Sequence, residues 1–215
     1  DAFDDLSPSQ TPRDNPALQF TGEDFREEID NDQLNIMFGF DAPGYKDAEK
    51  PVFTLLRELI SGGMSAPLFQ EIREKRGLVY SVQAQYAPGE SGGTFAIMAG
   101  TGKGNAGELV DVSLDLLGDV AQKGFTKAEI NTAIKRLVRK QETSSENSRN
   151  EAASNAGSYR RYGRVKTNEE FEFELKQVTA NDIRAAAANM LKEGKVAVAA
   201  VGPLDTLPSH DEIKA

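Results

Sequence analysis

The sequence predicts an α+β fold in which a mostly antiparallel sheet is covered by helices on one face. Segments of strand character gather in the first half of the chain, one more lies near its end, and a block of helical segments separates them. Strands and helices that segregate in this way favour an α+β layer over a parallel α/β fold. The composition agrees, because 39% hydrophobic and 27% charged residues are ordinary for a globular protein with a sizeable core.

Five segments have strand character. The second alternates through Leu34, Ile36, Phe38 and Phe40, the period of two that a strand with one buried face requires. The sequence APGESGG, rich in turn-forming residues, joins the third strand to the fourth. The predicted strands cover residues 18–29, 33–43, 79–86, 93–100 and 195–203.

The helical segments carry their own start signals. Thr126 with Glu129, and Thr167 with Glu170, have the spacing of a capping box, in which each side chain bonds the other residue's backbone N–H. The predicted helices cover residues 49–63, 65–76, 105–124, 126–163 with a break near 144–148, 167–177 and 180–192.

Composition also predicts the domain division. Residues 1–17 are acidic and rich in Pro and Ser, so we expect a linker-like segment that leads into one α+β domain, residues 18–203. Residues 204–215 form a polar tail, in which His210 is expected to be plain surface. No initiator methionine precedes the linker, which leaves open a fragment of a longer protein or a whole subunit.

Several function classes are excluded by composition. The net charge of −9 argues against nucleic acid, and no apolar run approaches the ~20 residues that cross a bilayer. Cysteine is absent, so thiolate chemistry is excluded and a reducing compartment is favoured. With one histidine, a single copy of the chain cannot assemble a Ser-His-Asp triad or a histidine-based zinc site.

A glycine pattern after the fourth strand matches a dinucleotide-binding motif only in its letters. Gly102, Gly104 and Gly107 have the spacing G-x-G-x-x-G, but more helix follows instead of the strand that a βαβ unit needs. We therefore expect a tight connection into a helix.

The candidate site lies where helix 65–76 meets the next strand. Ser65 is a possible N-cap, and Gly77 ends the helix. Helical spacing places Leu68 and Ile72 on an inward face and Arg73 on another, with Phe69 and Arg76.

On the strand that follows, alternation predicts that Tyr80 shares a face with Val82, Ala84 and Tyr86. From spacing alone, the pair is a surface arginine and a half-buried tyrosine. The alternative is that Arg73 and Tyr80 converge and donate hydrogen bonds to a peptide carbonyl or a developing oxyanion.

The stretch LRELISGGMSAPLFQEIREKRGLVYSVQAQYAPGESGGTFAIMAGT, with its flanks, resembles the C-terminal, non-zinc half of the pitrilysin-type zinc peptidases, or inverted zincins. This family includes insulin-degrading enzyme and mitochondrial processing peptidase. The similarity covers residues 18–203 and is greatest to bacterial two-domain members. It implies a LuxS/mitochondrial-processing-peptidase-like metallohydrolase domain that closes a peptide chamber against a second, zinc-bearing half.

The resemblance also implies roles for two residues. Arg73 and Tyr80 match the arginine and tyrosine that this half contributes across the chamber, where they bind the substrate backbone and stabilise the tetrahedral intermediate opposite the zinc. The motif His-x-x-Glu-His is missing from the corresponding helix, so the chain alone is predicted to bind no metal and to be inactive. The resemblance implies that zinc is bound by the partner half.

Three hypotheses remain open at this point. The chain is the C-terminal half of a longer zinc metalloendopeptidase, a non-catalytic subunit that pairs with a separate zinc-bearing chain, or a scaffolding relative. Each predicts an exposed apolar surface and hence possible self-association in isolation. The partners expected are the zinc-bearing half and a peptide substrate, with no nucleic acid and no membrane span. The bacterial cytoplasm is the expected compartment, with the periplasm as the alternative.

Overall fold

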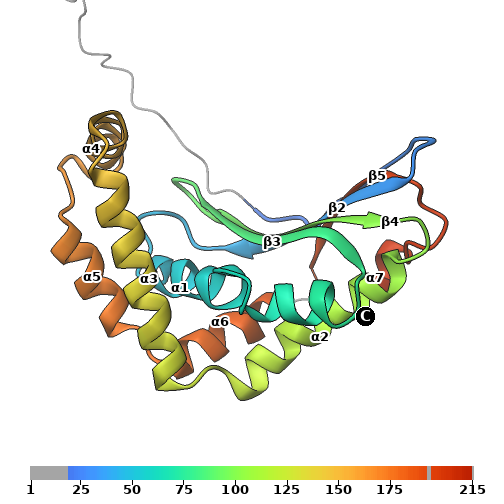
Figure 1. The fold of residues 1–215 in the computed structure, drawn as a ribbon. Helices are drawn as coiled ribbons and strands as arrows, with labels where there is room; N and C mark the ends of the chain where they lie inside the picture. Colours follow the sequence, from blue (N-terminus) through green and yellow to red (C-terminus); the bar gives the residue numbers. More distant parts are fainter. Residues whose placement is uncertain (1–18, 193–194, 215) are drawn as a thin grey trace, which may run out of the picture.

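The structure, a computed structural model, describes residues 19–192 and 195–214 (Figure 1). The predicted linker, residues 1–17, lies outside the described residues. The described part forms a curved sheet with its helices gathered on one side, as the α+β prediction requires.

The sheet has five strands in the order β1-β5-β2-β4-β3. Its β2–β5, β2–β4 and β4–β3 pairs are antiparallel, and only β1 pairs in parallel with β5. The five predicted strands are thereby confirmed, with bounds of Asp24–Glu28 for β1, Gln33–Ala42 for β2, Val79–Pro88 for β3, Gly93–Gly102 for β4 and Ala197–Gly202 for β5.

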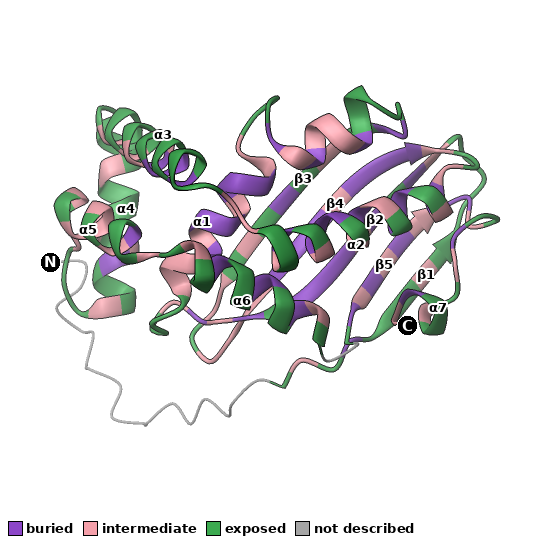
Figure 2. Ribbon diagram, turned by 90° about the horizontal axis from the view of Figure 1, so that it is seen from below, coloured by how far each residue is buried: buried purple, intermediate pink, exposed green. Residues whose placement is uncertain are grey.

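The helices cover one face of this sheet (Figure 2). Both predicted capping boxes form, at Thr126 and Thr167, and the long helical stretch breaks after Ser145. The elements are α1 (Lys50–Ser61), the π-helical η1 (Phe69–Glu74), α2 (Ala106–Lys123), α3 (Lys127–Ser145), α4 (Ser148–Tyr162), α5 (Asn168–Gln177), α6 (Ala180–Lys192) and α7 (His210–Lys214).

The core lies between the helices and one face of the sheet. Phe38 and Phe40 of β2 stand beside Ile97 and Phe95 of β4, and all four are at most 2% exposed. Burying a side chain of this size stabilises the fold by about 1.5–3 kcal/mol. The opposite face carries no covering helix among the described residues (Figure 1).

A buried ion pair ties α1 to α3. The Glu58 side chain is 5% exposed, and its carboxylate lies 3.0 Å from Arg57 Nη2 and 3.2 Å from Arg136 Nε. A carboxylate at this depth is tolerated because cations compensate its lost hydration. Beside it, Ser61 Oγ accepts a hydrogen bond from the backbone N–H of Ala84 in β3, at 2.9 Å. The end of α1 is therefore fixed to both α3 and the sheet.

The segment that follows β5 is more integrated than a polar tail suggests. Leu207 and Ile213 are buried in the core, and Ser209 with Glu212 caps the short helix α7. His210 is part-buried, with Nε2 2.7 Å from the carbonyl oxygen of Val196, so the expectation of a plain surface histidine was wrong.

The connection from η1 to β3 depends on Gly77. Gly77 has φ +63°, a left-handed conformation that costs an L-residue with a side chain about 1–2 kcal/mol. Its N–H bonds the carbonyl of Arg73 and the next N–H, of Leu78, bonds the carbonyl of Ile72, each at 3.0 Å. The Leu78 carbonyl accepts from Thr101 Oγ1 at 2.5 Å and from Asn105 Nδ2 at 3.3 Å. The turn is thus held by backbone and side-chain bonds together.

We predict opposite effects for two glycine substitutions. Gly77→Ala is expected to lower the free energy of unfolding by about 1–2 kcal/mol, because the left-handed backbone strains a side chain there. Gly118→Ala, inside α2 with open space around it, is expected to raise it by about 0.5–1 kcal/mol. Urea unfolding of both variants measures the two values. A Gly77→Ala variant as stable as the wild type would contradict the role given to the turn.

The Glu170 carboxylate makes the stability of the fold depend on pH. Arg164 Nη1 donates a hydrogen bond to Glu170 Oε2 at 2.8 Å, which lowers the pKa of Glu170 from 4.5 to about 2. Since the folded pKa lies below the unfolded one, the stabilisation is complete above pH 4.5 and is lost as the pH falls towards 2. The stability difference between wild type and Glu170→Gln, followed by urea midpoints, should shrink over this range. Glu142→Gln, an exposed carboxylate on α3, is the control, and a difference that persists at pH 2 would contradict the assignment.

Candidate functional site

Arg73 lies in a π-helical turn. The N–H of Lys75 bonds the carbonyl of Gln70 at 3.0 Å, five residues back, so η1 is wider than an α-helix. Leu68 and Ile72 are buried, as predicted, and Arg73 is exposed. The Arg73 guanidinium carbon lies 5.0 Å from the centre of the Phe69 ring, which confirms that Phe69 and Arg73 share a face. Single π-helical turns occur frequently at functional sites.

Arg73 differs in its charge partners from the two cations that follow it, Lys75 and Arg76. Lys75 and Arg76 both bind the Glu71 carboxylate, whose pKa is lowered mainly by the hydrogen bond from Lys75. Arg76 Nε additionally lies 3.6 Å from Glu108 Oε1. Within the described part of the chain, Arg73 forms no ion pair. Its guanidinium is exposed to solvent.

A β-bulge turns Tyr80 out of phase with the rest of β3. Val79 pairs with Thr101 and Ser81 pairs with Gly100, so β3 has one extra residue, Tyr80, at this point. A bulge of this kind re-aims a side chain and is common at sheet edges and beside active sites. β3 is an edge strand of this sheet.

The prediction that Tyr80 shares a face with Val82, Ala84 and Tyr86 was therefore wrong. Those three side chains contact the core, whereas Tyr80 is 61% exposed. A Cβ atom built on Gly102 would lie 3.3 Å from the Tyr80 hydroxyl oxygen, and one on Gly100 would lie 3.2 Å from Ser81 Oγ. Gly100 and Gly102 are two residues apart on β4, so Tyr80 and Ser81 lie on the same face, the one without helices.

The structure places Arg73 and Tyr80 on the two sides of one short connection. The guanidinium stacks on Phe69 and the phenol lies over Gly102, and no hydrogen bond joins the two side chains. Neither side chain donates a hydrogen bond to any group in residues 19–192 and 195–214. Both side chains are exposed, and the prediction is that they donate to one carbonyl oxygen.

The described residues do not fit zinc. Among them, no group of three His, Cys, Asp or Glu side chains is arranged to hold a metal ion. Helix α1 offers no histidine, and its one acidic side chain, Glu58, is already bound to two arginines. The only histidine of the chain, His210, faces the Val196 carbonyl.

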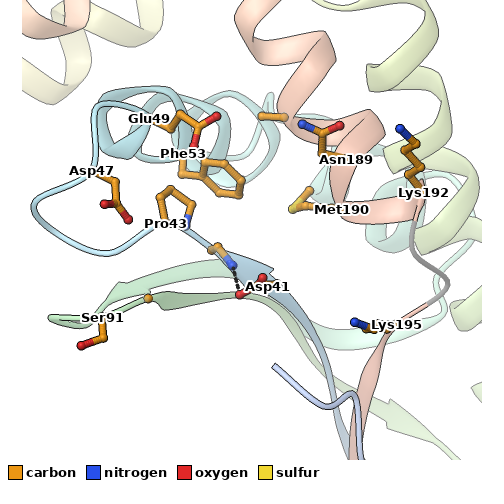
Figure 3. Close-up of a pocket in the computed structure, with 13 residues that line it drawn as sticks. Asp41, Pro43, Asp47, Glu49, Phe53, Ser91, Asn189, Met190, Lys192 and Lys195 are labelled. Carbon is orange, nitrogen blue, oxygen red and sulfur yellow. Dashed lines mark hydrogen bonds between the residues drawn. The ribbon is translucent and has the colours of Figure 1, made fainter. Parts of the chain in front are cut away.

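A separate cavity of about 640 Å³ lies at the other end of the sheet (Figure 3). Asp41, Asp47 and Glu49 line one side of it, with Lys192 and Lys195 on the other. Two of its carboxylates bond the nearby backbone, Asp41 to Ala42 N at 3.0 Å and Asp47 to Gly44 N at 2.7 Å. The cavity lies at the Gly93 end of β4, where Gly93 pairs with Ala42. Gly93 and Gly102 are nine residues apart, which is about 30 Å along the strand at ~3.3 Å per residue. This cavity cannot contact the same peptide bond as Tyr80.

Curated relatives share the sequence over most of this chain. An uncharacterized zinc protease of Mycobacterium tuberculosis is 28% identical over 174 residues, which cover 81% of this chain and 40% of that protein. One of Bacillus subtilis is 25% identical over 193 residues, 89% of this chain and 46% of that protein. The chain thus spans less than half the length of these bacterial relatives.

Solved structures share the fold. A structure described as the peptidase M16 inactive domain from Pseudomonas fluorescens superposes with a TM-score of 0.70, at 23% identity, over 85% of this chain and 43% of that one. A protease from Helicobacter pylori gives a TM-score of 0.79 at 17% identity, over 92% and 48%. A chain of complex III2 from Candida albicans gives 0.79 at 13% identity, over 90% and 48%. At these identities the likeness shows the fold alone.

No described helix is long and apolar enough to cross a membrane. The family model of the peptidase M16 inactive domain matches residues 1–137, more than half of the chain. Together with the bacterial zinc proteases of similar sequence, this match confirms the resemblance seen in the sequence. The chain belongs to the peptidase M16 inactive domain family.

Proposed function

We propose that this domain completes the active site of a zinc metalloendopeptidase by closing its peptide chamber. Arg73 and Tyr80 would bind the substrate carbonyl opposite a zinc ion held by the N-terminal half. The zinc, when bound in that half, activates the attacking water. The side chains of this chain hold the carbonyl in place and stabilise the negative charge that develops on its oxygen.

The observation that carries the proposal is the β-bulge at Tyr80. A tyrosine that only packs would keep the phase of β3 and bury its ring with Val82 and Ala84. Here the backbone departs from the regular ladder, and the result is a phenol 61% exposed. Exposing a large ring costs hydrophobic burial. This cost is explained if the Tyr80 hydroxyl must be exposed to donate a hydrogen bond to a ligand.

Charge around Arg73 supports the same role. Lys75 and Arg76 are neutralised by Glu71 and Glu108, while Arg73 lies over the Phe69 ring and forms no ion pair with any described residue. A guanidinium can donate to a carbonyl while keeping its stacking contact. The pair would thus offer one charged and one neutral donor to the same oxygen.

The partner in this proposal is the zinc-bearing half, either on the same polypeptide or on a separate homologous subunit. Because a protease of Helicobacter pylori and a chain of complex III2 share the fold, the fold does not separate a catalytic half from a scaffolding relative. Peptide hydrolysis that depends on Arg73 and Tyr80 would separate them. We propose the bacterial cytoplasm as the compartment, in keeping with the lack of cysteine.

Peptide hydrolysis tests the two donors. The domain is combined with its zinc-bearing half and assayed on a quenched fluorescent peptide. Tyr80→Phe and Arg73→Ala are each expected to lower kcat by about 10²–10³-fold, since each removes one donor to the developing oxyanion. KM should change much less, because the interaction is strongest in the transition state.

Two matched controls lie on α4. Tyr159→Phe removes the hydroxyl of another exposed tyrosine, and Arg160→Ala removes another exposed arginine. Both should keep wild-type kcat. If Tyr80→Phe and Arg73→Ala, with unchanged melting temperatures, also hydrolyse at the wild-type rate, the two residues are ordinary surface and the scaffolding role is favoured.

A further inference from the structure

A shallow cavity of about 400 Å³ adjoins Tyr80 on the uncovered face of the sheet. It is lined from four strands, β5, β2, β4 and β3. Ser81 belongs to its lining and follows Tyr80 directly in the chain. Gly100, opposite Ser81, forms part of its floor, and Gly102, under the Tyr80 phenol, is two residues further along β4. The cavity is therefore continuous with the surface that carries Tyr80.

Its floor is apolar and adaptable. Met37 and Met98 are directly paired across β2 and β4, and Ala199 pairs with Met37 from β5. Val201 extends the same surface beside Asn35. Methionine side chains adjust to ligands of different shape, and small residues beside them leave room. Over Gly100 the polar side chains of Gln33 and Ser81 close in, because a Cβ atom there would lie 2.6 Å from Gln33 Nε2 and 3.2 Å from Ser81 Oγ.

Its rim is polar but uncharged. Asn35, Ser81 and Gln83 are exposed, and none of the described residues that line the cavity is charged. Asn35 Oδ1 accepts a hydrogen bond from Gln33 Nε2. The Ser81 hydroxyl and the side-chain amide of Gln83 form no hydrogen bond with any group in residues 19–192 and 195–214. An apolar floor with a few polar groups is typical of sites that bind a small part of a ligand specifically.

We propose that this cavity binds an uncharged, apolar side chain of the substrate peptide, within a few residues of the bond that is cleaved. This inference rests on the proposed function, because it takes Tyr80 to mark the position of the scissile carbonyl. Unpaired amide and hydroxyl groups on the rim would bond the peptide main chain. The neutral lining selects against charged side chains, although the chain as a whole carries a net charge of −9.

Three variants test the cavity in the enzyme that contains both halves. Met37→Glu places a carboxylate on the floor, and Met37→Gln is its neutral match of equal length. Phe173→Glu adds the same charge at an exposed apolar position on α5, away from the sheet. The probes are peptides that differ by Leu, Lys or Glu at single positions within three residues of the cleaved bond.

The wild type should prefer Leu over Lys by at least tenfold in kcat/KM at one of these positions. Met37→Glu should shift the Leu/Lys ratio towards Lys by at least tenfold, Met37→Gln should weaken the Leu preference without favouring Lys, and Phe173→Glu should change nothing. Ratios that stay within twofold of wild type in both Met37 variants overturn the proposal.

Binding to the zinc-free enzyme gives a second readout that needs no hydrolysis. Fluorescence anisotropy of the same labelled peptides should show the same order of affinities and the same reversal by Met37→Glu. If hydrolysis survives Tyr80→Phe but the binding ratios shift as described, the catalytic role fails and the cavity stands. If Tyr80→Phe abolishes hydrolysis and the binding ratios do not move, the cavity fails and the catalytic role stands.

Discussion

The constraint on which this structure depends is that its sheet buries one face only. Along β2 and β5 every second side chain enters the core beneath the helices, as Phe38 and Phe40 do on β2, and most of the others face away. A strand that keeps this period cannot move one side chain to the opposite face without moving all of those beyond it. The one extra residue in β3 moves Tyr80 to the opposite face and leaves the rest of the strand in phase. Val79 and Val82 both contact the core, and Tyr80 and Ser81 between them face outward.

A second irregularity, the π-helical turn of η1, lies just before the β-bulge along the chain. The π-helical turn of η1 carries Arg73, Gly77 reverses the chain, and the bulge carries Tyr80. Each departure from regular geometry costs free energy, and the surroundings hold it in place: Thr101 and Asn105 bond the Leu78 carbonyl, and Ser61 bonds β3 next to the end of α1. A rigid frame of this kind would keep two donors pointed at a substrate that another half of the enzyme brings to them.

The sequence predicted the elements because their signals are local. Alternation through Leu34, Ile36, Phe38 and Phe40 identified β2, and Thr126 and Thr167 located two helix starts.

The bulge was missed because VYSVQAQY alternates well enough to suit a regular strand, and only pairing with Gly100 and Thr101 reveals the extra residue. Helix α7 was missed although Ser209 and Glu212 have capping-box spacing, since the surrounding residues are polar and Ile213 finds its apolar contacts only in the folded core. The roles of Arg73 and Tyr80 were predicted from family resemblance; spacing already placed Arg73 on the surface, whereas the exposure of Tyr80 came from the structure.

The position of a bound peptide tests the composite active site most directly. A crystal structure of the enzyme with both halves, made inactive by removal of zinc and soaked with a Leu-containing peptide, shows which groups meet the scissile carbonyl. We expect the Tyr80 hydroxyl and the Arg73 guanidinium within about 2.7–3.1 Å of its oxygen, or of the position this oxygen takes in the tetrahedral intermediate. A peptide bound in the zinc half with Tyr80 and Arg73 both left in solvent would contradict the composite active site.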